Sequence, residues 1–200
     1  ALEYIHAIDS PYGAEFALFF GATSKDPDVR DHALDVASRF WTFTGAAHVA
    51  MQHIIDSPRT TLDERASLYA MMRRSHNRWT IDFVKERLLD DSIQREEKAW
   101  AARALAHLME PALVPFLVEQ LLHQPRQVRV ELAMVLRRIT NRAEEIDWEV
   151  APQEEVLAAH QKWTACWEAH RGMDREIWLA QGFAAIGVEP EYYTAPSAIE

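Results

Sequence analysis

The sequence predicts an all-α protein built from about four two-helix repeats, and three observations support this prediction. Ala, Leu, Glu and Arg dominate the composition and only 6 of 200 residues are glycine, which favours helix over strand. Apolar residues recur at helical spacing along most of the chain. This pattern itself recurs every 31–35 residues, which is typical of stacked helical hairpins.

Four pairs of adjacent bulky apolar residues indicate where the first helices end. The pairs are Phe19-Phe20, Ile54-Ile55, Leu88-Leu89 and Leu121-Leu122, at spacings of 35, 34 and 33 residues. Each pair precedes a short polar or proline-containing break, as expected at helix ends and in short helix–helix connections. The sequence therefore predicts first helices near residues 12–22, 44–56, 78–90 and 111–123.

A second column of residues begins after each break and indicates the second helices. Its members are Val29-Arg30, Glu64-Arg65, Glu97-Lys98 and Val128-Arg129, in which the second residue is always basic. Three, four and seven positions after each first member come the residues of an amphipathic face. They are Ala33, Leu34 and Ala37; Leu68, Tyr69 and Met72; Ala101, Ala102 and Leu105; and Leu132, Ala133 and Leu136. We expect second helices near 28–41, 62–76, 93–109 and 127–140.

The two columns divide residues 1–140 into four repeats, at about 12–41, 44–76, 78–109 and 111–140. One hairpin cannot bury its apolar face alone, whereas stacked hairpins bury a continuous core. Residues 141–186 are expected to form an acidic linker and a Trp-rich helical cap. There Trp163 and Trp167 share one helix face, and a further short helix is expected near 174–186. Residues 187–200 are interpreted as a tail.

Several segments resemble a known family of helical repeats. Asp26-Pro27-Asp28-Val29-Arg30, Pro125-Arg126-Gln127-Val128-Arg129 and Pro111-Ala112-Leu113-Val114-Pro115-Phe116-Leu117 are similar to bacterial HEAT-like repeats, once named after phycobilisome lyases. Lys162-Trp163 and the segment 167–172 resemble the closing segment of some bacterial HEAT-repeat proteins. The resemblance implies a right-handed α-solenoid of HEAT-like hairpins. It indicates fold more than function, because this fold mostly presents surfaces.

The net charge of −10 is unevenly distributed. Residues 1–140 hold 17 Lys and Arg against 19 Asp and Glu, whereas residues 141–200 hold 4 against 12. The acidic C-terminal part could therefore steer a basic partner. No stretch of about 18 apolar residues predicts a transmembrane helix, and no export signal is recognisable. A cytoplasmic protein without a membrane partner is expected.

The segments that could carry chemistry do not indicate an enzyme. His48 and His53 are five residues apart, His-Glu-x-x-His is absent, and no histidine directly precedes a glutamate. The single cysteine, Cys166, excludes a disulfide framework and is interpreted as a small buried side chain. Glycine-rich phosphate loops and serine hydrolase elbows are absent. We expect no catalytic residue, no metal site and no cofactor.

Basic residues near the ends of the second helices form the candidate binding site, which we call the basic column. Its members are Arg39, Arg73, Arg74, His107, Arg137 and Arg138. Cations near a helix C-terminus offset the macrodipole by about 0.3–1 kcal/mol each, which explains these residue types without a ligand. Stacked repeats would also align them into a stripe that receives an acidic peptide or phosphates. The sequence leaves both interpretations open.

These patterns predict a non-catalytic scaffold, adaptor or inhibitor whose partner is another protein. The alternative is a nucleic-acid-binding protein, by analogy with HEAT-like alkylpurine DNA glycosylases. In its favour, residues 65–138 hold 13 Lys and Arg against 9 Asp and Glu, and Trp79 is close to Asp82. A pI near 5.4 implies weak attraction to DNA, so nucleic acid is not the expected partner. A third hypothesis, a bilin lyase or another role with a small molecule, is suggested only by the name of the phycobilisome-lyase repeats.

The tryptophans of the repeats have two interpretations. Trp41, Trp79 and Trp100 are expected in the core between repeats, because buried aromatic area is the larger energetic contribution. The other interpretation is that they are exposed platforms on which a base or a peptide stacks.

Overall fold

The computed structural model describes residues 12–40, 43–75, 78–142, 144–185 and 187, and within these ranges every regular element is a helix. The α-helices are α2 (Tyr12–Thr23), α3 (Pro27–Ser38), α4 (Gly45–Asp56), α5 (Leu62–Ser75), α6 (Trp79–Leu89), α7 (Arg95–Ala104), α8 (Val114–His123), α9 (Arg126–Thr140), α10 (Gln153–His170) and α11 (Arg175–Ala185). Two 3-10 helices, η1 (Leu105–His107) and η2 (Pro111–Leu113), flank the loop before α8. The predicted all-α class is confirmed. Apart from Gly187, the predicted tail lies outside the described residues.

The helix positions follow the predicted ranges, with two differences around the third connection. The helix expected over 93–109 is divided, because α7 ends at Ala104 and η1 follows before Met109 takes a positive φ of 52°. The helix expected over 111–123 begins as η2. Proline has no amide hydrogen to donate, so Pro111 and Pro115 are tolerated only in the first turns of η2 and α8.

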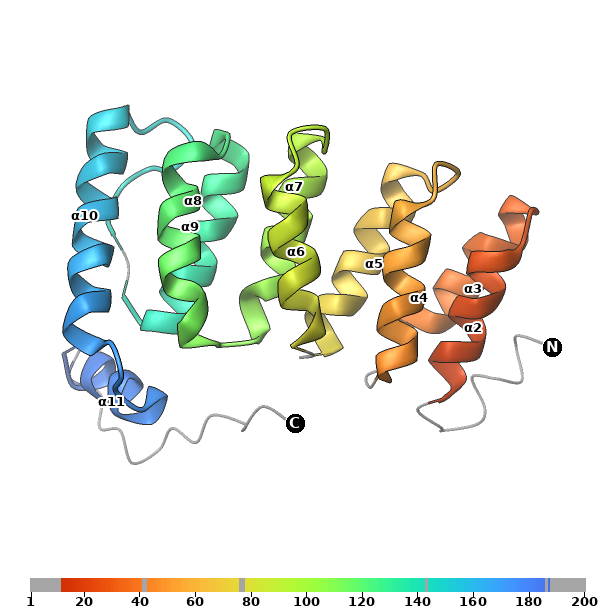
Figure 1. Cartoon of the computed structure of the whole chain (residues 1–200), viewed down its shortest axis with the longest axis horizontal. Coiled ribbons are helices and arrows are strands. Elements are labelled where there is room, and N and C mark those ends of the chain that lie inside the picture. The colour runs from red at the N-terminus through yellow and green to blue at the C-terminus, as the bar shows by residue number, and fades with distance from the viewer. Residues whose placement is uncertain (1–11, 41–42, 76–77, 143, 186, 188–200) are drawn as a thin grey trace.

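The helices lie in antiparallel pairs that follow one another along the long axis of the molecule (Figure 1). Among the first helices of the pairs, α4 contacts both α2 and α6. The second helices α3, α5, α7 and α9 each contact the next one in the row. After the fourth pair, α10 packs on α8 and α11 contacts α9. Each pair therefore completes the core of its neighbours.

The core confirms the second predicted column. All twelve apolar positions of that column are buried, and Ala33, Leu68, Ala101 and Leu132 are fully inaccessible. Burying a Leu or Met side chain stabilises a fold by about 1.5–3 kcal/mol, so this column contributes a large share of the burial energy. A continuous cluster of buried residues runs from Ala17 in α2 to Trp178 in α11.

The bulky pair that marks the end of α2 lies outside the core. Phe19 and Phe20 are 59% and 41% exposed, whereas Ile54 and Ile55 of α4 are buried. The buried face of α2 consists of small residues and one leucine: Gly13, Ala14, Ala17, Leu18 and Gly21. A Cβ at Gly21 would lie 3.8 Å from side chains of α3 and α4, so small residues let these helices approach closely. The aromatic side chains of α2 consequently face outward.

The C-terminal segment packs through its tryptophans. Trp163 of α10 is only 1% exposed, and its ring stacks on Trp148 with centroids 5.4 Å apart. Trp167 lies against Trp178 with ring centroids 5.9 Å apart, which connects α10 to α11. In α11, Trp178 is buried whereas Ile177 is 52% exposed. Among the described helices, none is long and apolar enough to cross a membrane.

Candidate functional site

The basic column lies where second helices end. Arg73 and Arg74 are in the last turn of α5, and Arg137 and Arg138 are in the last turn of α9. Arg39 is the C-cap of α3, and its guanidinium pairs with Asp35 of the same helix. Orphan carbonyl groups collect at these helix ends, so each cation compensates a local partial negative charge.

Two hydrogen bonds join members of the basic column to the preceding hairpin. A guanidinium nitrogen of Arg74 donates to the backbone oxygen of Ser38, at the end of α3, over 2.7 Å. A guanidinium nitrogen of Arg138 lies 3.4 Å from Nε2 of His107 in η1. The structure therefore brings Arg74 to the end of α3 and Arg138 to His107. It does not gather all six residues into one cluster.

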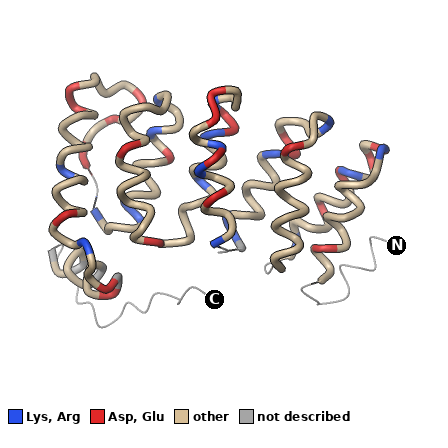
Figure 2. Tube along the Cα trace, in the orientation of Figure 1, with Lys and Arg blue, Asp and Glu red and all other residues tan. Residues whose placement is uncertain are grey.

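Arg73 and Arg137 differ from the other members of the basic column. Over the described residues, neither side chain has an ion pair or hydrogen bond, and Arg137 is exposed while Arg73 is half-buried. Figure 2 shows basic and acidic segments alternating along the helices, so the surrounding charge is mixed. Among the arginines of the column, only these two have no side-chain partner within the described residues.

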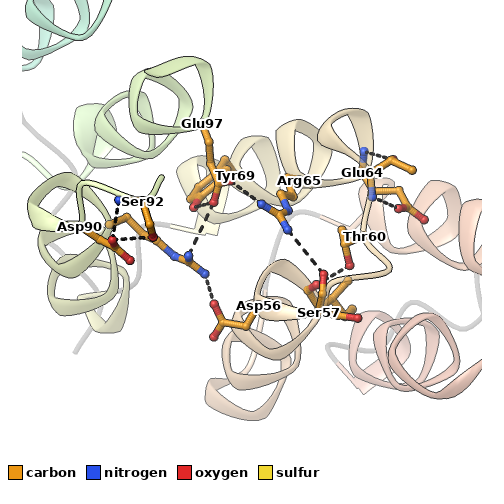
Figure 3. Close-up of polar contacts among 12 residues, drawn as sticks. Asp56, Ser57, Thr60, Glu64, Arg65, Tyr69, Asp90, Ser92 and Glu97 are labelled. Atoms are coloured by element: carbon orange, nitrogen blue, oxygen red, sulfur yellow. Dashed lines mark hydrogen bonds and ion pairs between the residues drawn. The ribbon is translucent and has the colours of Figure 1, made fainter. Parts of the chain in front are cut away.

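A buried polar network in the middle of the molecule was not predicted from the sequence (Figure 3). Glu97 of α7 is fully buried and accepts hydrogen bonds from Arg65 over 2.6 Å and from the hydroxyl of Tyr69 over 3.0 Å. Arg87 of α6 lies 3.9 Å from the same carboxylate and also pairs with Asp56 of α4. One carboxylate thus ties α5, α6 and α7 together.

The network repeats one hairpin earlier. Nε of Arg30 in α3 donates to Glu64 of α5 over 3.3 Å, just as Arg65 of α5 donates to Glu97 of α7. In both ion pairs, the basic residue at the start of one second helix binds the glutamate at the start of the next second helix. Val128 takes the equivalent position in α9 and cannot accept a hydrogen bond, so the series ends.

Beyond the two ion pairs, the same basic positions bind backbone carbonyl groups. Nζ of Lys98 donates to the carbonyl oxygen of Leu88 over 3.0 Å, and Nε of Arg129 donates to that of Gln124 over 2.9 Å. The sequence showed that these basic residues occupy equivalent positions at the start of each second helix. The sequence did not predict that Arg30 and Arg65 join neighbouring hairpins, because their partners lie a whole repeat away.

The Tyr69 hydroxyl acts as a hydrogen-bond donor in this network. Burial raises the pKa of the Tyr69 hydroxyl above its usual value of 10.0, and the adjacent Glu97 carboxylate raises it further. The hydroxyl therefore stays protonated and donates to Glu97. Buried carboxylates that are fully paired in this way hold helices in register.

The described histidines are exposed or half-buried, with the exception of His48 in α4. His48 is fully buried, and burial lowers its pKa to about 4, so the ring is neutral at pH 7. Nδ1 of His170 lies 2.6 Å from the backbone oxygen of Cys166, and its ring stacks on Trp178. Cys166 is buried and unbridged. The described residues contain no group of three His, Cys, Asp or Glu able to hold a metal ion.

The tryptophans of the repeats divide between the two interpretations. Trp79, the first residue of α6, is 59% exposed, so the expectation that it lies in the core is wrong. Its ring leans over the backbone of Gly45, where an added Cβ would meet it at 2.6 Å. Trp100 is half-buried against the core as expected, and Trp41 lies outside the described residues.

Comparison with protein-family models, with curated proteins and with solved structures found no match to this chain.

Proposed function

We propose that this chain is an α-solenoid of HEAT-like repeats that binds another protein as a scaffold, adaptor or inhibitor and is not itself a catalyst. The observation that carries the proposal is the row of helical pairs, in which α2, α4 and α6 contact one another in turn, as do α3, α5, α7 and α9. Such stacking produces long surfaces in which each repeat contributes equivalent positions. Surfaces of this kind bind partners without needing a catalytic constellation.

The edge where the second helices end is the proposed contact surface. Arg73 and Arg137 present unpaired guanidinium groups there, as judged over the described residues. Guanidinium groups bind carboxylates through paired, charge-assisted hydrogen bonds, and arginine is enriched at interface hot spots. The expected partner therefore carries an acidic segment that reaches from the end of α5 toward the end of α9.

Charge reversal at this edge tests the proposal. The tagged chain is used to capture proteins from its source organism, beside the double variants Arg73→Glu with Arg137→Glu and Arg59→Glu with Arg126→Glu. The second pair is the control, because Arg59 and Arg126 are exposed arginines away from this edge. We expect one stoichiometric protein to be retained by the wild type and the control and lost by the first variant.

Two results count against this proposal. One is the absence of any stoichiometric protein. The other is equal retention by all three chains while the unfolding free energy of the first variant falls, which would assign Arg73 and Arg137 to the helix dipole alone.

One observation favours nucleic-acid binding as a second candidate function. Trp79 is largely exposed beside the exposed Arg78 and Asp82, so a base could stack on it. The net charge of −10 opposes this candidate. Duplex DNA titrations at rising salt decide between the two, since phosphate-driven affinity falls steeply with salt. Tight binding at low salt that collapses at higher salt would support it, and loss of that binding in Trp79→Ala would locate it.

A further inference from the structure

A stripe of aromatic side chains runs along α2 at one end of the row of helical pairs (Figure 1). Tyr12 and Phe16 are each 60% exposed, and Phe19 and Phe20 are exposed with them. Residues four, seven and eight positions after Tyr12 share one side of a helix. The buried residues of α2 lie on the other side, against α3 and α4. This aromatic stripe therefore faces away from the rest of the row.

The aromatic stripe is large enough to form the apolar part of an interface. An aromatic side chain has about 200 Å² to bury, so the exposed fractions of these four residues amount to roughly 440 Å². A standard protein–protein interface covers about 800 Å² on each partner, of which roughly 450 Å² is apolar. Single exposed apolar residues are common, whereas contiguous patches of several hundred Å² mark contact surfaces.

Beside the stripe, exposed residues of α3 and its C-cap form a polar series. Its members, at spacings of four, three and four residues, are Asp28, His32, Asp35 and Arg39. This spacing places them on one side of the helix. On the opposite side, Arg30 pairs with Glu64 of α5, so the polar series faces away from α5. Asp31, the remaining exposed charge of α3, lies at the edge of this face.

The polar series is complementary to a second copy of itself that runs in the opposite direction. In that orientation, Asp28 of each copy lies opposite Arg39 of the other, and His32 lies opposite Asp35. Arg39 already pairs with Asp35 of its own helix, and its guanidinium has donors for a second carboxylate. An imidazole has an N–H group to donate to a carboxylate whether or not it is charged. A parallel orientation would instead bring like residues together, which is unfavourable for the aspartates and the arginines.

One two-fold axis can relate both helices at once. The midpoint of the aromatic stripe, between Phe16 and Phe19, lies about six residues before α2 ends at Thr23. The midpoint of the polar series lies about six residues after α3 begins at Pro27. Because both helices rise by about 1.5 Å per residue from the same turn, the two midpoints lie at nearly the same height. The axis that pairs the polar series then also places Phe16 of each copy against Phe19 of the other.

We propose that α2 and α3 form a two-fold interface with the same helices of a second copy of this chain, each helix antiparallel to its counterpart. The aromatic stripes make the centre of the interface, and the polar series determines its orientation. Every contact occurs twice, as two-fold symmetry requires, and the two rows of helical pairs join end to end. The interface does not depend on the proposed protein-binding function, because Arg73 and Arg137 lie on neither α2 nor α3.

Sedimentation velocity on the full chain tests the interface. We expect a mass about twice the 23.0 kDa of one chain. Phe16→Glu places a charge at the centre of the aromatic stripe and should give a monomer. Leu89→Glu is the control, because Leu89 is an apolar residue of α6 that is 61% exposed, and this variant should stay dimeric. Both positions are exposed, so circular dichroism should show an unchanged helix content.

Three results overturn this proposal. The first is a wild type that is monomeric or larger than a dimer. The second is a dimer that persists in Phe16→Glu. The third is a dimer lost equally in Phe16→Glu and Leu89→Glu, because the added charge and not the stripe would then be responsible. None of these results depends on capture of another protein, so this proposal and the proposed function fail independently.

Two charge reversals test the antiparallel orientation. Asp28→Arg and Arg39→Asp each place like charges opposite each other at both symmetric contacts, so each variant alone should dimerise about tenfold or more weakly. In a mixture of the two variants, opposite charges face each other again at both contacts, so a heterodimer should form with an affinity near that of the wild type. Each reversal also places an unfavourable charge at an end of α3, and mixing does not remove that effect.

The regained dimer therefore reports pairing across the interface alone. A mixture that dimerises as weakly as the separate variants contradicts the antiparallel orientation. Dimerisation of either variant alone with wild-type affinity contradicts the contact between Asp28 and Arg39.

Discussion

Glu97 is the shared acceptor of the buried network, with side-chain contacts to α5 and α6. Replacing it with alanine leaves the buried Tyr69 hydroxyl without its acceptor and removes the ion-pair partner of the partly buried Arg65. Removing one partner of a buried ion pair costs about 3–5 kcal/mol, so we expect a loss of that order in Glu97→Ala. Urea unfolding monitored by circular dichroism measures it.

Glu86→Ala is the matched control for that experiment. Glu86 has the same charge and lies within α6, but its side chain is exposed. We expect a change of less than about 0.5 kcal/mol, as for most surface substitutions. Equal losses in the two variants would mean that Glu97 contributes only through net charge.

His48 makes stability depend on pH through burial. Its pKa is lowered from 6.5 to about 4, so the unfolded chain binds a proton more readily than the folded chain. The stabilising effect is therefore complete above pH 6.5 and is lost as the pH falls toward 4. A shift of this size corresponds to roughly 3 kcal/mol. The unfolding free energy, measured between pH 7.5 and 4.5, should fall more in the wild type than in His48→Gln.

The outcome that contradicts the His48 prediction is a parallel pH dependence in both chains. His53 provides the control, because it is on the same helix but exposed. His53→Gln should retain the pH dependence of the wild type.

At the scale of residues, the sequence showed which positions are equivalent but not what they bind. Arg65 and Glu97 were both visible as members of one column, and their ion pair follows from an offset of one repeat that only stacking determines. The unpaired state of Arg137 was equally hidden, because a helix-end arginine with a partner and one without a partner have the same sequence pattern.

The start of α5 carries a reciprocal cap that joins the scale of residues to the scale of helices. The backbone N–H of Thr61 donates to Glu64 over 2.6 Å, and the backbone N–H of Glu64 donates to the Thr61 hydroxyl over 3.2 Å. This is a capping box, and it holds the same Glu64 that receives Arg30 from α3. The cap therefore positions an acceptor for the neighbouring hairpin.

Thr61→Ala removes one half of this cap. We expect a loss of about 1 kcal/mol in unfolding free energy, the usual cost of replacing a capping threonine by alanine. Thr164→Ala is the control, because the Thr164 hydroxyl binds the His160 carbonyl oxygen on the exposed surface within α10. Alanine is the better helix former there, so stability should be unchanged or higher. A Thr61→Ala variant as stable as the wild type would contradict the prediction.

Helices were predictable where their periodicity was strong, and less so where small residues replaced bulky ones. The second helices carry bulky or alanine positions at regular spacing, and all of these positions are buried. In α2 the core face is mostly Gly and Ala, so the strongest apolar signal in the sequence comes from Phe19 and Phe20 on the outer face. The stacking of Trp148 on Trp163 could not be predicted, because residues 144–152 have no periodicity from which their course could be inferred.

For the molecule as a whole, the proposed solenoid implies that stability is local. A stack in which each pair contacts only its neighbours behaves as a chain of coupled units, whereas a closed globular core unfolds as one. Leu18 of α2 and Leu117 of α8 are both fully buried and lie in the first and fourth pairs. They are matched probes of the two ends.

Hydrogen exchange measured by mass spectrometry on Leu18→Ala and Leu117→Ala distinguishes these two behaviours. Each change removes the same group, and a core Leu-to-Ala substitution costs about 2–5 kcal/mol. In a solenoid, Leu18→Ala speeds exchange in α2, α3 and α4 and leaves α9 and α10 as they are in the wild type. Leu117→Ala does the reverse, with faster exchange in α8, α9 and α10. Equal acceleration along the whole chain in both variants would show a single cooperative core and would contradict the solenoid, because distant pairs share no contacts through which such a loss could spread.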